Sequence, residues 1–289
     1  MADDGLMQLQ RFDSVDAFME AAGPYLLARE AEHNLILGIA ASLAVDADTY
    51  DGPPLLLTVG PAGGDPAAIA IRTPPHNLVL SEVDDPRAVV PFLVSGLAGE
   101  TLPGVVGPPA AACALADAWT VAYGGSWHVT REERIYRLAE VVDPRPGAGS
   151  ARLADVTDRE TIGGWLLAFH REALDEEAET GMIERSMESW VRGSRRFWLW
   201  EVDRQPVSMV GMGGRTPNGA RIGPVYTPPE ERGHGYASRL TAQVSRTMLE
   251  EGRRYCFLYT DLGNKTANHV YQAIGYRPVT DAVMLGFSS

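Results

Sequence analysis

Cysteine is scarce in this chain. Only Cys113 and Cys256 occur among 289 residues, far apart and without neighbouring metal ligands. Two isolated cysteines cannot build a disulfide framework, and a thiolate metal site needs several ligands at short spacing. We therefore expect no metal site, and we expect both cysteines in apolar surroundings.

Long apolar runs are missing as well. No stretch approaches the roughly 18 consecutive apolar residues that a membrane-spanning helix requires. The first five residues, MADDG, are acidic and polar, so they lack the basic region and apolar core of a secretory signal. These features predict a cytoplasmic protein that does not act at a membrane.

Positive charge is also in short supply. The formal net charge is −13, with 25 lysines and arginines against 38 aspartates and glutamates. Binding of nucleic acid needs clustered lysine and arginine at the phosphates, so a nucleic-acid partner is disfavoured. The acidity is compatible with a cationic substrate, and equally with a role in solubility alone.

The length and composition are typical of a folded protein with two domains. Hydrophobic residues make up 45% and charged residues 22% of the chain, and domains average roughly 150 residues. The clearest interruption is the run from Asp143 to Ser150, in which two prolines and two glycines exclude a continuing helix or strand. We place the boundary there, with domains 1–145 and 146–289.

Both halves predict the same order of helices and strands. In the first half, Ser14 and the pair Asp85-Pro86 have the residue types that begin helices. We expect helical segments after Ser14 and at 86–97 and 109–123, and strands at 55–59, 67–72, 78–80, 104–107 and 134–138. In the second half we expect helices at 158–174, 182–192, 235–251 and 266–274, and strands at 197–200, 207–213, 221–227, 255–260 and 283–287. The shared order indicates an internal duplication.

A glycine-containing loop joins one of these strands to a helix. The run from Val225 to Ala237 includes Arg232-x-x-Gly235-x-Ala237 and begins where the strand meets two prolines. In such a loop, successive backbone N–H groups and the positive end of the helix dipole can face one anion, and glycine allows its close approach. Pro228 cannot donate a hydrogen bond to a neighbouring strand, so we expect the sheet to separate there. The pattern alone occurs often by chance.

A second pattern follows on a later helix. It runs from Asn264 through Ala267 to Tyr271, and then to Gly275 and Tyr276. The two patterns together, in this order and with a helix and a strand between them, resemble the GNAT superfamily of acyl-CoA-dependent N-acyltransferases. The resemblance is specific over about residues 207–279 and only topological before residue 152.

The resemblance implies an α/β fold with a mixed sheet (α+β) and two GNAT-like domains. It further implies transfer of an acetyl group from acetyl-CoA, as co-substrate, to a primary amine on a small molecule or a protein, by direct attack in a ternary complex. The first domain has Ser81 to Pro86 at its corresponding loop, without glycine and with two aspartates that would repel pyrophosphate. That domain is therefore expected to be a degenerate copy, although a helix around residues 30–34 could still reach the active site.

The resemblance also assigns roles to individual residues. Tyr271 would be the general acid that protonates the departing thiolate, unless it only packs. Cofactor contacts would come from Val225, Tyr226, Thr227, Arg232, Gly233, His234, Gly235, Tyr236, Ala237, Ser238 and Asn264. His234 could instead be simply exposed, and the pair Trp198 and Trp200 is more typical of a core than of a cofactor platform.

The general base is less well defined by the sequence. A lysine-like amine has a pKa near 10.4, so forming its neutral state at pH 7 costs about 4.6 kcal/mol, and a base or water chain must accept the proton. Some family members carry a glutamate at the strand end before the asparagine, where this chain has Tyr259. Asp261, or Glu172 in the charged run 170–177, could serve instead.

Two alternatives stay open at this point. The protein could be a non-catalytic acyl-CoA sensor or scaffold, for which the missing glutamate is the best support. It could also be a GNAT enzyme that uses another acyl group or an acceptor like that of mycothiol synthase. Nucleotide binding by the loop is disfavoured because the lysine and serine or threonine of a P-loop are missing.

Overall fold

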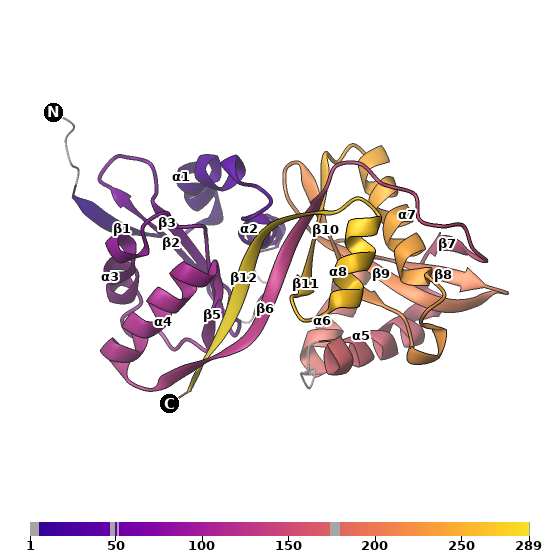
Figure 1. Ribbon diagram of the computed structural model, residues 1–289. Coiled ribbons are helices and arrows are strands. Elements are labelled where there is room, and N and C mark those ends of the chain that lie inside the picture. Colours follow the sequence, from indigo (N-terminus) through magenta and orange to yellow (C-terminus); the bar gives the residue numbers. More distant parts are fainter. Residues whose placement is uncertain (1–5, 47–49, 51, 174–179, 289) are drawn as a thin grey trace. The chain divides into compact units, whose positions relative to one another are not determined.

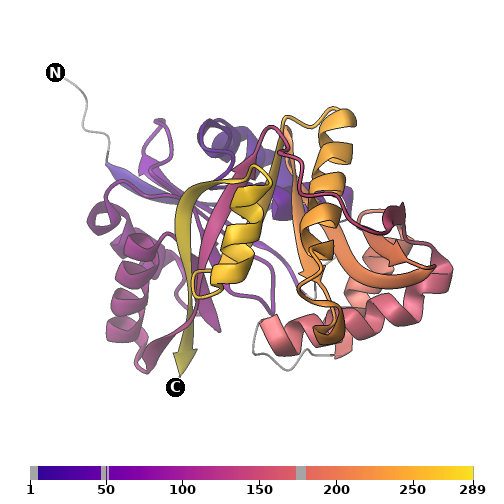
Figure 2. The ribbon, with the colours of Figure 1, turned by 45° about the vertical axis from the view of Figure 1, so that its right-hand side comes forward.

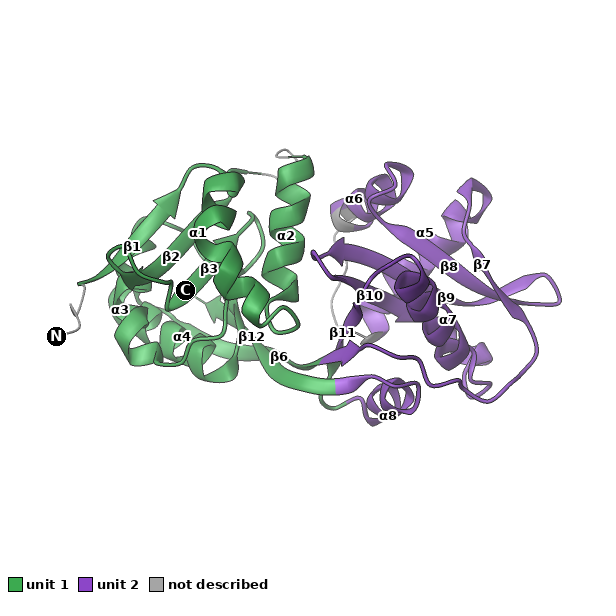
Figure 3. Ribbon diagram, turned by 90° about the horizontal axis from the view of Figure 1, so that it is seen from above, with its two compact units in different colours: residues 1–135, 260–263, 278–289 green, residues 136–259, 264–277 purple. Residues whose placement is uncertain are grey.

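The computed structural model of the chain describes residues 6–46, 50, 52–173 and 180–288. They form two compact units (Figure 3): unit 1 contains Met1–Ile135, Thr260–Gly263 and Pro278–Ser289, and unit 2 contains Tyr136–Tyr259 and Asn264–Arg277. The expected boundary at 145/146 lies within unit 2. The acidic start 1–5, the end of the predicted helix at Leu174 and residues 174–177 of the charged run lie outside the described residues. None of the described helices is both long enough and apolar enough to cross a membrane.

The elements of the first half alternate as expected (Figure 1). They are β1 (Met7–Phe12), α1 (Val15–Ala28), α2 (Asn34–Val45), β2 (Leu55–Pro61), β3 (Ala68–Arg72), β4 (Leu78–Leu80), α3 (Pro86–Gly96), β5 (Gly104–Gly107), α4 (Pro109–Tyr123) and β6 (Ser126–Leu138).

The second half repeats this order with two added 3-10 turns. It contains β7 (Ser150–Leu153), η2 (Val156–Asp158), α5 (Arg159–Ala173), α6 (Thr180–Val191), β8 (Arg196–Val202), β9 (Gln205–Arg215), β10 (Gly219–Tyr226), η3 (Pro229–Glu231), α7 (Tyr236–Glu250), β11 (Tyr255–Asp261), α8 (Lys265–Ala273) and β12 (Arg277–Ser288). Each of the ten elements of the first half has its counterpart, so the topology supports an internal duplication. The sequence pattern did not predict β1 and β7, which both lie at an end of the strand order.

Side chains cap the helices where the sequence predicts their starts. The Ser14 hydroxyl accepts a hydrogen bond from the Ala17 N–H (3.2 Å), and the Asp85 carboxylate accepts one from the Arg87 N–H (3.0 Å). Pro86 occupies the first position of α3, where its missing N–H has no consequence. These caps satisfy backbone groups that a helix leaves unpaired at its first turn.

Unit 1 contains a mixed sheet that is covered on both faces. Its strand order is β1-β2-β3-β4-β5-β12-β6, and β4 and β5 run parallel. Leu55, Leu57 and Val59 pack with the apolar residues of α3 and α4, whereas Leu56 packs with those of α1 and α2. Successive residues of a strand point to opposite faces, so burial of both faces explains why Leu55, Leu56 and Leu57 are all apolar.

Unit 2 follows the same plan with the strand order β6-β11-β10-β9-β8-β7. Trp198 and Trp200 belong to the core cluster that includes residues of α7 and α8, while Phe197 and Leu199 belong to the cluster of α5 and α6. The expectation that the two tryptophans are core residues is confirmed. Cys256 is fully buried in the first of these clusters, and Cys113 packs against the unit 1 core.

The last strand of each half contributes to the other unit. The C-terminal strand β12 pairs antiparallel with β5 of unit 1, with Met284 opposite Val106. Conversely, β6 lies next to β11 in the strand order, and its residues Tyr136 and Leu138 are buried in the unit 2 core. Figures 1 and 2 show β6 and β12 running side by side. The two halves of the sequence therefore do not coincide with the two compact units.

The proline- and glycine-rich segment between β6 and β7 has no helix or strand up to Ser150, as predicted. It is nevertheless bound to unit 2. The Arg239 Nε of α7 donates to the carbonyl of Arg145 (3.0 Å), and the Trp200 Nε1 donates to the carbonyl of Ala148 (3.0 Å). These bonds make the segment part of unit 2.

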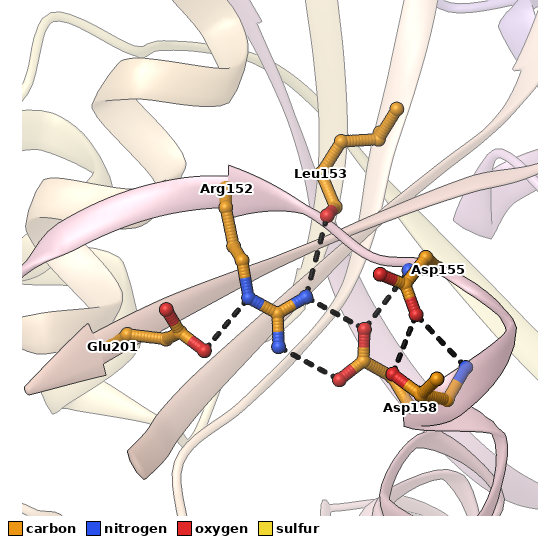
Figure 4. Close-up of polar contacts among 6 residues, drawn as sticks. Arg152, Leu153, Asp155, Asp158 and Glu201 are labelled. Atoms are coloured by element: carbon orange, nitrogen blue, oxygen red, sulfur yellow. Dashed lines mark hydrogen bonds and ion pairs between the residues drawn. The ribbon is translucent and has the colours of Figure 1, made fainter. Parts of the chain in front are cut away.

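A network around Arg152 fixes the start of α5 (Figure 4). Arg152 of β7 donates two hydrogen bonds to Asp158, at 2.6 and 2.8 Å, and one to Glu201 of β8 at 2.7 Å. Asp158 also accepts from the Asp155 N–H (2.9 Å), in a capping box that opens the helix. The Arg152 guanidinium lowers the pKa of the Asp158 carboxyl, so this buried group stays ionised. The network ties β7, β8 and α5 together.

The contribution of β6 to unit 2 can be tested with two fragments. Fragment 146–289 lacks Tyr136 and Leu138, so its core is incomplete and we expect no cooperative thermal unfolding by circular dichroism. Fragment 126–289 restores β6 and serves as the matched control, for which we expect a cooperative transition. Equal cooperativity in both fragments would show that unit 2 does not need β6.

Candidate functional site

The central feature of unit 2 is the separation of two parallel strands. β10 and β11 are paired at Gly219 with Tyr255, Ala220 with Cys256 and Arg221 with Phe257. Beyond that point the described residues form no further pairs between them, although both strands continue. On its other side β10 stays paired with β9 as far as Tyr226. The edge of β10 that faces β11 is therefore open, and its separation begins well before Pro228, where the sequence predicted it.

A β-bulge accompanies this separation. Ile222 pairs with Met212 and Val225 with Val210, so Gly223 and Pro224 together oppose the single residue Gly211. Pro224 has no N–H to donate, which a bulge tolerates. A Cβ on Gly211 would lie 2.9 Å from both the Gly223 carbonyl oxygen and Pro224 Cδ. Only glycine fits opposite the bulge without displacing the backbone.

The loop after β10 ends at the N-terminus of α7. Gly233 and Gly235 have φ angles of 83° and 76°, a region that side chains disfavour. Gly235 is the N-cap residue, and no described side chain caps the helix. The first turn begins with the Arg239 N–H donating to the Gly235 carbonyl (3.2 Å), so the N–H groups of Tyr236, Ala237 and Ser238 precede the helical pattern. This arrangement suits an anion such as a phosphate.

Glu172, at the end of α5, connects β10 with this loop. Its carboxylate accepts from the Tyr226 hydroxyl (2.8 Å) and from Arg232 Nη2 (2.5 Å), while Arg232 Nε donates to the Thr227 carbonyl (2.9 Å). The hydrogen bonds from Arg232 and then Tyr226 lower the pKa of Glu172. Burial and the neighbouring carboxylate raise the pKa of Tyr226 to about 12. The Arg232 charge is thus already paired, and Glu172 is a weaker base than a free glutamate.

Further polar contacts support the strand end and the loop. Ser208 of β9 places its hydroxyl 2.9 Å from that of Thr227 and donates to the Tyr226 carbonyl (3.2 Å). His234 is exposed, and its ring stacks on Tyr236 with the ring centroids 5.3 Å apart. Ser208 was not predicted as part of the site, because nothing in its local sequence distinguishes it from other strand serines.

The start of α8 uses two asparagines. The Asn264 side-chain oxygen accepts from the Ala267 N–H (3.0 Å), so Asn264 caps the helix. Asn268 donates to the Asn264 carbonyl (2.8 Å) and accepts from the Tyr136 hydroxyl (2.8 Å). The amide oxygen of Asn264 is therefore engaged within the protein, while its NH₂ group has no bond among the described residues.

Tyr271 lies on α8 inside the unit 2 core. Its ring meets that of Tyr276 edge-on at 6.1 Å, and it belongs to the same cluster as the partly buried Val225 and Tyr236. Its hydroxyl has no hydrogen-bond partner among the described residues. Burial raises the pKa of Tyr271 to about 12, so the phenol stays protonated at neutral pH. The other predicted base, Asp261, is exposed at the end of β11 and accepts from the Gly263 N–H (2.5 Å).

In unit 1 the backbone after β4 is already occupied. The Glu82 N–H donates to His33 Nε2 (3.0 Å), and the Glu82 carbonyl accepts from the Tyr25 hydroxyl (2.6 Å). His33 is buried, which lowers its pKa, and its Nδ1 lies 3.1 Å from the Leu26 carbonyl. The neutral ring therefore donates through Nδ1 and accepts through Nε2.

Two further details of unit 1 concern the predicted loop and helix. Asp84 pairs with Arg29 (3.3 Å), and Asp85 caps α3. The predicted helix around residues 30–34 is wrong: residues 29–33 form a turn between α1 and α2, in which His33 is buried. A turn is favoured because it brings the His33 ring to the backbone of Glu82.

Comparisons with known proteins found a matching family model and several similar folds. Residues 160–276 match the model of the Acetyltransferase (GNAT) family. A Drosophila protein of known structure has 12% identity, covering 97% of this chain and 98% of its own, with a TM-score of 0.71. A GCN5-related N-acetyltransferase from Sphaerobacter thermophilus has 17% identity, 99% and 96% coverage and a TM-score of 0.61. A tandem GNAT protein from the clavulanic acid biosynthesis pathway has 14% identity, 98% coverage of both chains and a TM-score of 0.55. At these identities the likeness shows a shared fold. No curated protein sequence matches significantly.

The bulge can be tested at Gly211. In Gly211→Ala the new Cβ would lie 2.9 Å from the Gly223 carbonyl oxygen and from the rings of Phe197 and Pro224, so we expect urea unfolding to show a loss of about 1–3 kcal/mol in stability. Gly213→Ala is the matched control, because its Cβ would lie 3.4 Å from the nearest atom, in the flexible Arg195 side chain. Equal stability of the two variants would show that the bulge does not require glycine.

Proposed function

We propose that this protein transfers the acetyl group of acetyl-CoA to a primary amine. The proposal starts from the match of residues 160–276 to the acetyltransferase (GNAT) family. The observation that carries the proposal is the open edge of β10, followed after the loop 227–235 by the N-terminus of α7, which no described side chain caps. An extended pantetheine arm can add to such an edge as a further strand, and a pyrophosphate can bind at such a helix start.

The cofactor would be bound mainly by backbone groups. The peptide groups of Val225, Tyr226 and Thr227 would bond the pantetheine amides, and the N–H groups of residues 233–238 would surround the pyrophosphate. Because Glu172 already pairs with Arg232, the guanidinium is held beside the loop and its charge is largely compensated. The attraction for pyrophosphate would come chiefly from the N–H groups and the helix dipole.

Tyr271 would act as the general acid. Its pKa of about 12 exceeds that of a thiol, about 8.5, so complete transfer of its proton to a solvated thiolate is unfavourable by roughly 5 kcal/mol. Removal of the thiolate from water raises the pKa of its conjugate thiol and narrows this gap. The hydroxyl would therefore donate a hydrogen bond that strengthens as negative charge develops on sulfur.

The attacking amine must lose a proton to a base. Glu172 is the weaker of the two candidates, because its lowered pKa reduces its proton affinity and its oxygens are already bonded. Asp261, whose carboxylate accepts from the Gly263 N–H, stays the other candidate. In this scheme Glu172 positions Arg232 and Tyr226, and the neutral amine attacks the thioester directly without a covalent enzyme intermediate.

Unit 1 would be a degenerate second copy. His33 and Tyr25 occupy the N–H and the carbonyl of Glu82, next to the strand β4 that corresponds to β10. In unit 2 the edge of β10 that faces β11 has no strand partner beyond Arg221 among the described residues. We therefore propose a single acyl-CoA site in the chain, with unit 1 contributing β6 to the fold of unit 2.

A second candidate function is acyl-CoA sensing without transfer. The presence of Tyr259 in β11, where related enzymes can carry glutamate, and the pairing of Glu172 with Arg232 both favour it. The two functions differ in one observable. Release of free CoA that depends on an added amine indicates transfer, and tight binding without release indicates a sensor.

Calorimetric titration tests the cofactor site. We expect acetyl-CoA to bind saturably with one equivalent per chain. Gly235→Val should weaken binding at least tenfold, because a branched residue is strained at φ 76°. Gly252→Ala, a change at another glycine with positive φ in the same unit, should leave the affinity unchanged. Absence of binding at millimolar acetyl-CoA would refute the proposal. Binding of two equivalents per chain would refute the idea that unit 1 has no acyl-CoA site.

The acid role predicts a specific kinetic defect. Tyr271→Phe should lower kcat by roughly 100-fold or more and leave the dissociation constant of acetyl-CoA within a factor of two. Thiol release against a panel of amines measures the rate. Tyr255→Phe, which removes a hydroxyl without hydrogen-bond partners among the described residues, is the control and should keep full turnover. If kcat is unaffected in Tyr271→Phe, the role of Tyr271 is packing and not acid catalysis.

A further inference from the structure

A polar cavity lies within unit 2 at the C-terminal end of α7, opposite the end that carries the Gly235 loop. It encloses about 150 Å³ and is lined by Arg196, Arg215, Arg253, Glu251, Met212 and Met248. The cavity forms where β8 begins, β9 ends and α7 terminates. Because α7 has 15 residues, its two ends are roughly 22 Å apart. The cavity is thus separate from the loop at Gly235.

Only one of the three arginines has a strong partner. Arg196 donates to both oxygens of Glu251, at 2.7 and 2.6 Å, but its Nε is buried without a hydrogen-bond partner. Arg253 makes a long bond to the Thr216 carbonyl (3.4 Å). Arg215 forms no ion pair or hydrogen bond within the described part of the chain, and it is exposed. Three guanidinium groups therefore face a single carboxylate.

The charges are close enough to act on one another. The pKa of Glu251 is lowered first by its hydrogen bonds from Arg196, and further by the charges of Arg215 and Arg253. Three cations around one anion leave an excess of positive charge, in a protein whose formal net charge is −13. An anion in the cavity would relieve this repulsion and could accept hydrogen bonds from the unpaired N–H groups.

The shape and donor set favour a tetrahedral oxyanion. Guanidinium groups present planar pairs of N–H donors that match the oxygens of phosphate. The volume is several times the roughly 30 Å³ that a water molecule occupies in the liquid, so a phosphate group fits. Apolar ligands are disfavoured because only the two methionines and Ala220 contribute apolar lining.

We propose that this arginine-lined cavity is a second ligand site, which binds the phosphate group of a small molecule independently of acyl-CoA. Arg215 and Arg253 would provide the main contacts, because both have donors to spare. Arg196 would stay paired with Glu251 and add only its charge. The site does not depend on the transferase function of unit 2, since no residue of the acyl-CoA loop lines it.

Calorimetry with inorganic phosphate on the full-length chain tests this site. Titrations are run at low ionic strength, with and without excess CoA, because the α7 N-terminus can also bind phosphate. We expect phosphate binding to persist with CoA present, and its dissociation constant to rise at least tenfold in the double variant Arg215→Gln/Arg253→Gln. The control Arg87→Gln/Arg277→Gln removes equal charge at two exposed positions and should bind phosphate as the parent does. Glycerol phosphate in place of phosphate distinguishes a phosphomonoester site, by tighter binding, from a site for the free ion.

The variant Glu251→Gln should change the phosphate affinity in the opposite direction. Glu251 supplies the one carboxylate among the residues that line the cavity. Its removal should tighten phosphate binding several-fold, a result that a purely structural role of the arginines would not produce. Matching thermal unfolding midpoints in chloride buffer would show that the arginine variants remain folded. The proposal is overturned if phosphate does not bind with CoA present, or if the double arginine variant binds it as tightly as its control.

Discussion

The hydrogen bonds between β10 and β11 end at Arg221 and Phe257, and the candidate site of unit 2 depends on that interruption. A parallel pair that continued to Tyr226 would satisfy the strand's own N–H and carbonyl groups and leave nothing for a ligand. The bulge of Gly223 and Pro224 opposite Gly211 changes the path of β10 at this point. Backbone groups that a sheet normally uses internally are thereby left for another molecule, and the glycines of the following loop extend the same surface to the start of α7.

The positive potential at the candidate site likewise comes from backbone groups more than from side chains. An acidic protein that binds a polyanion needs local positive potential, yet Arg232, the arginine within the loop, is already paired with Glu172. The N–H groups at the α7 N-terminus supply that potential without any net charge. In contrast, the opposite end of α7 collects three arginines around Glu251. One helix therefore has two different means of attracting anions, peptide dipoles at its start and guanidinium groups at its end.

Much of this arrangement could be predicted from local sequence. Helix starts at Ser14 and Asp85 follow from capping chemistry, and the glycine loop and the α8 pattern predicted the family that the match over residues 160–276 supports. The short outer strands β1 and β7 escaped prediction because each has only one strand neighbour and little burial. The contact of Glu172 with Arg232 joins residues 60 positions apart, and no local pattern encodes such a pairing. Likewise, the pairing of β12 with β5 is a property of the whole topology, so the predicted boundary at 145/146 and the compact units divide the chain at different places.

The exchange of β6 and β12 affects the order in which the chain can acquire structure. Unit 1 is synthesised first, but the strand that follows β5 in its sheet comes from residues 277–288. Until those residues emerge from the ribosome, the edge of β5 that pairs with β12 has no partner strand. An unpaired strand edge is a site for mispairing. Unit 2, which receives β6 from sequence already translated, has all of its strands by Asp261 and its last helix soon after. All strands of unit 2 are thus translated before the last strand of unit 1.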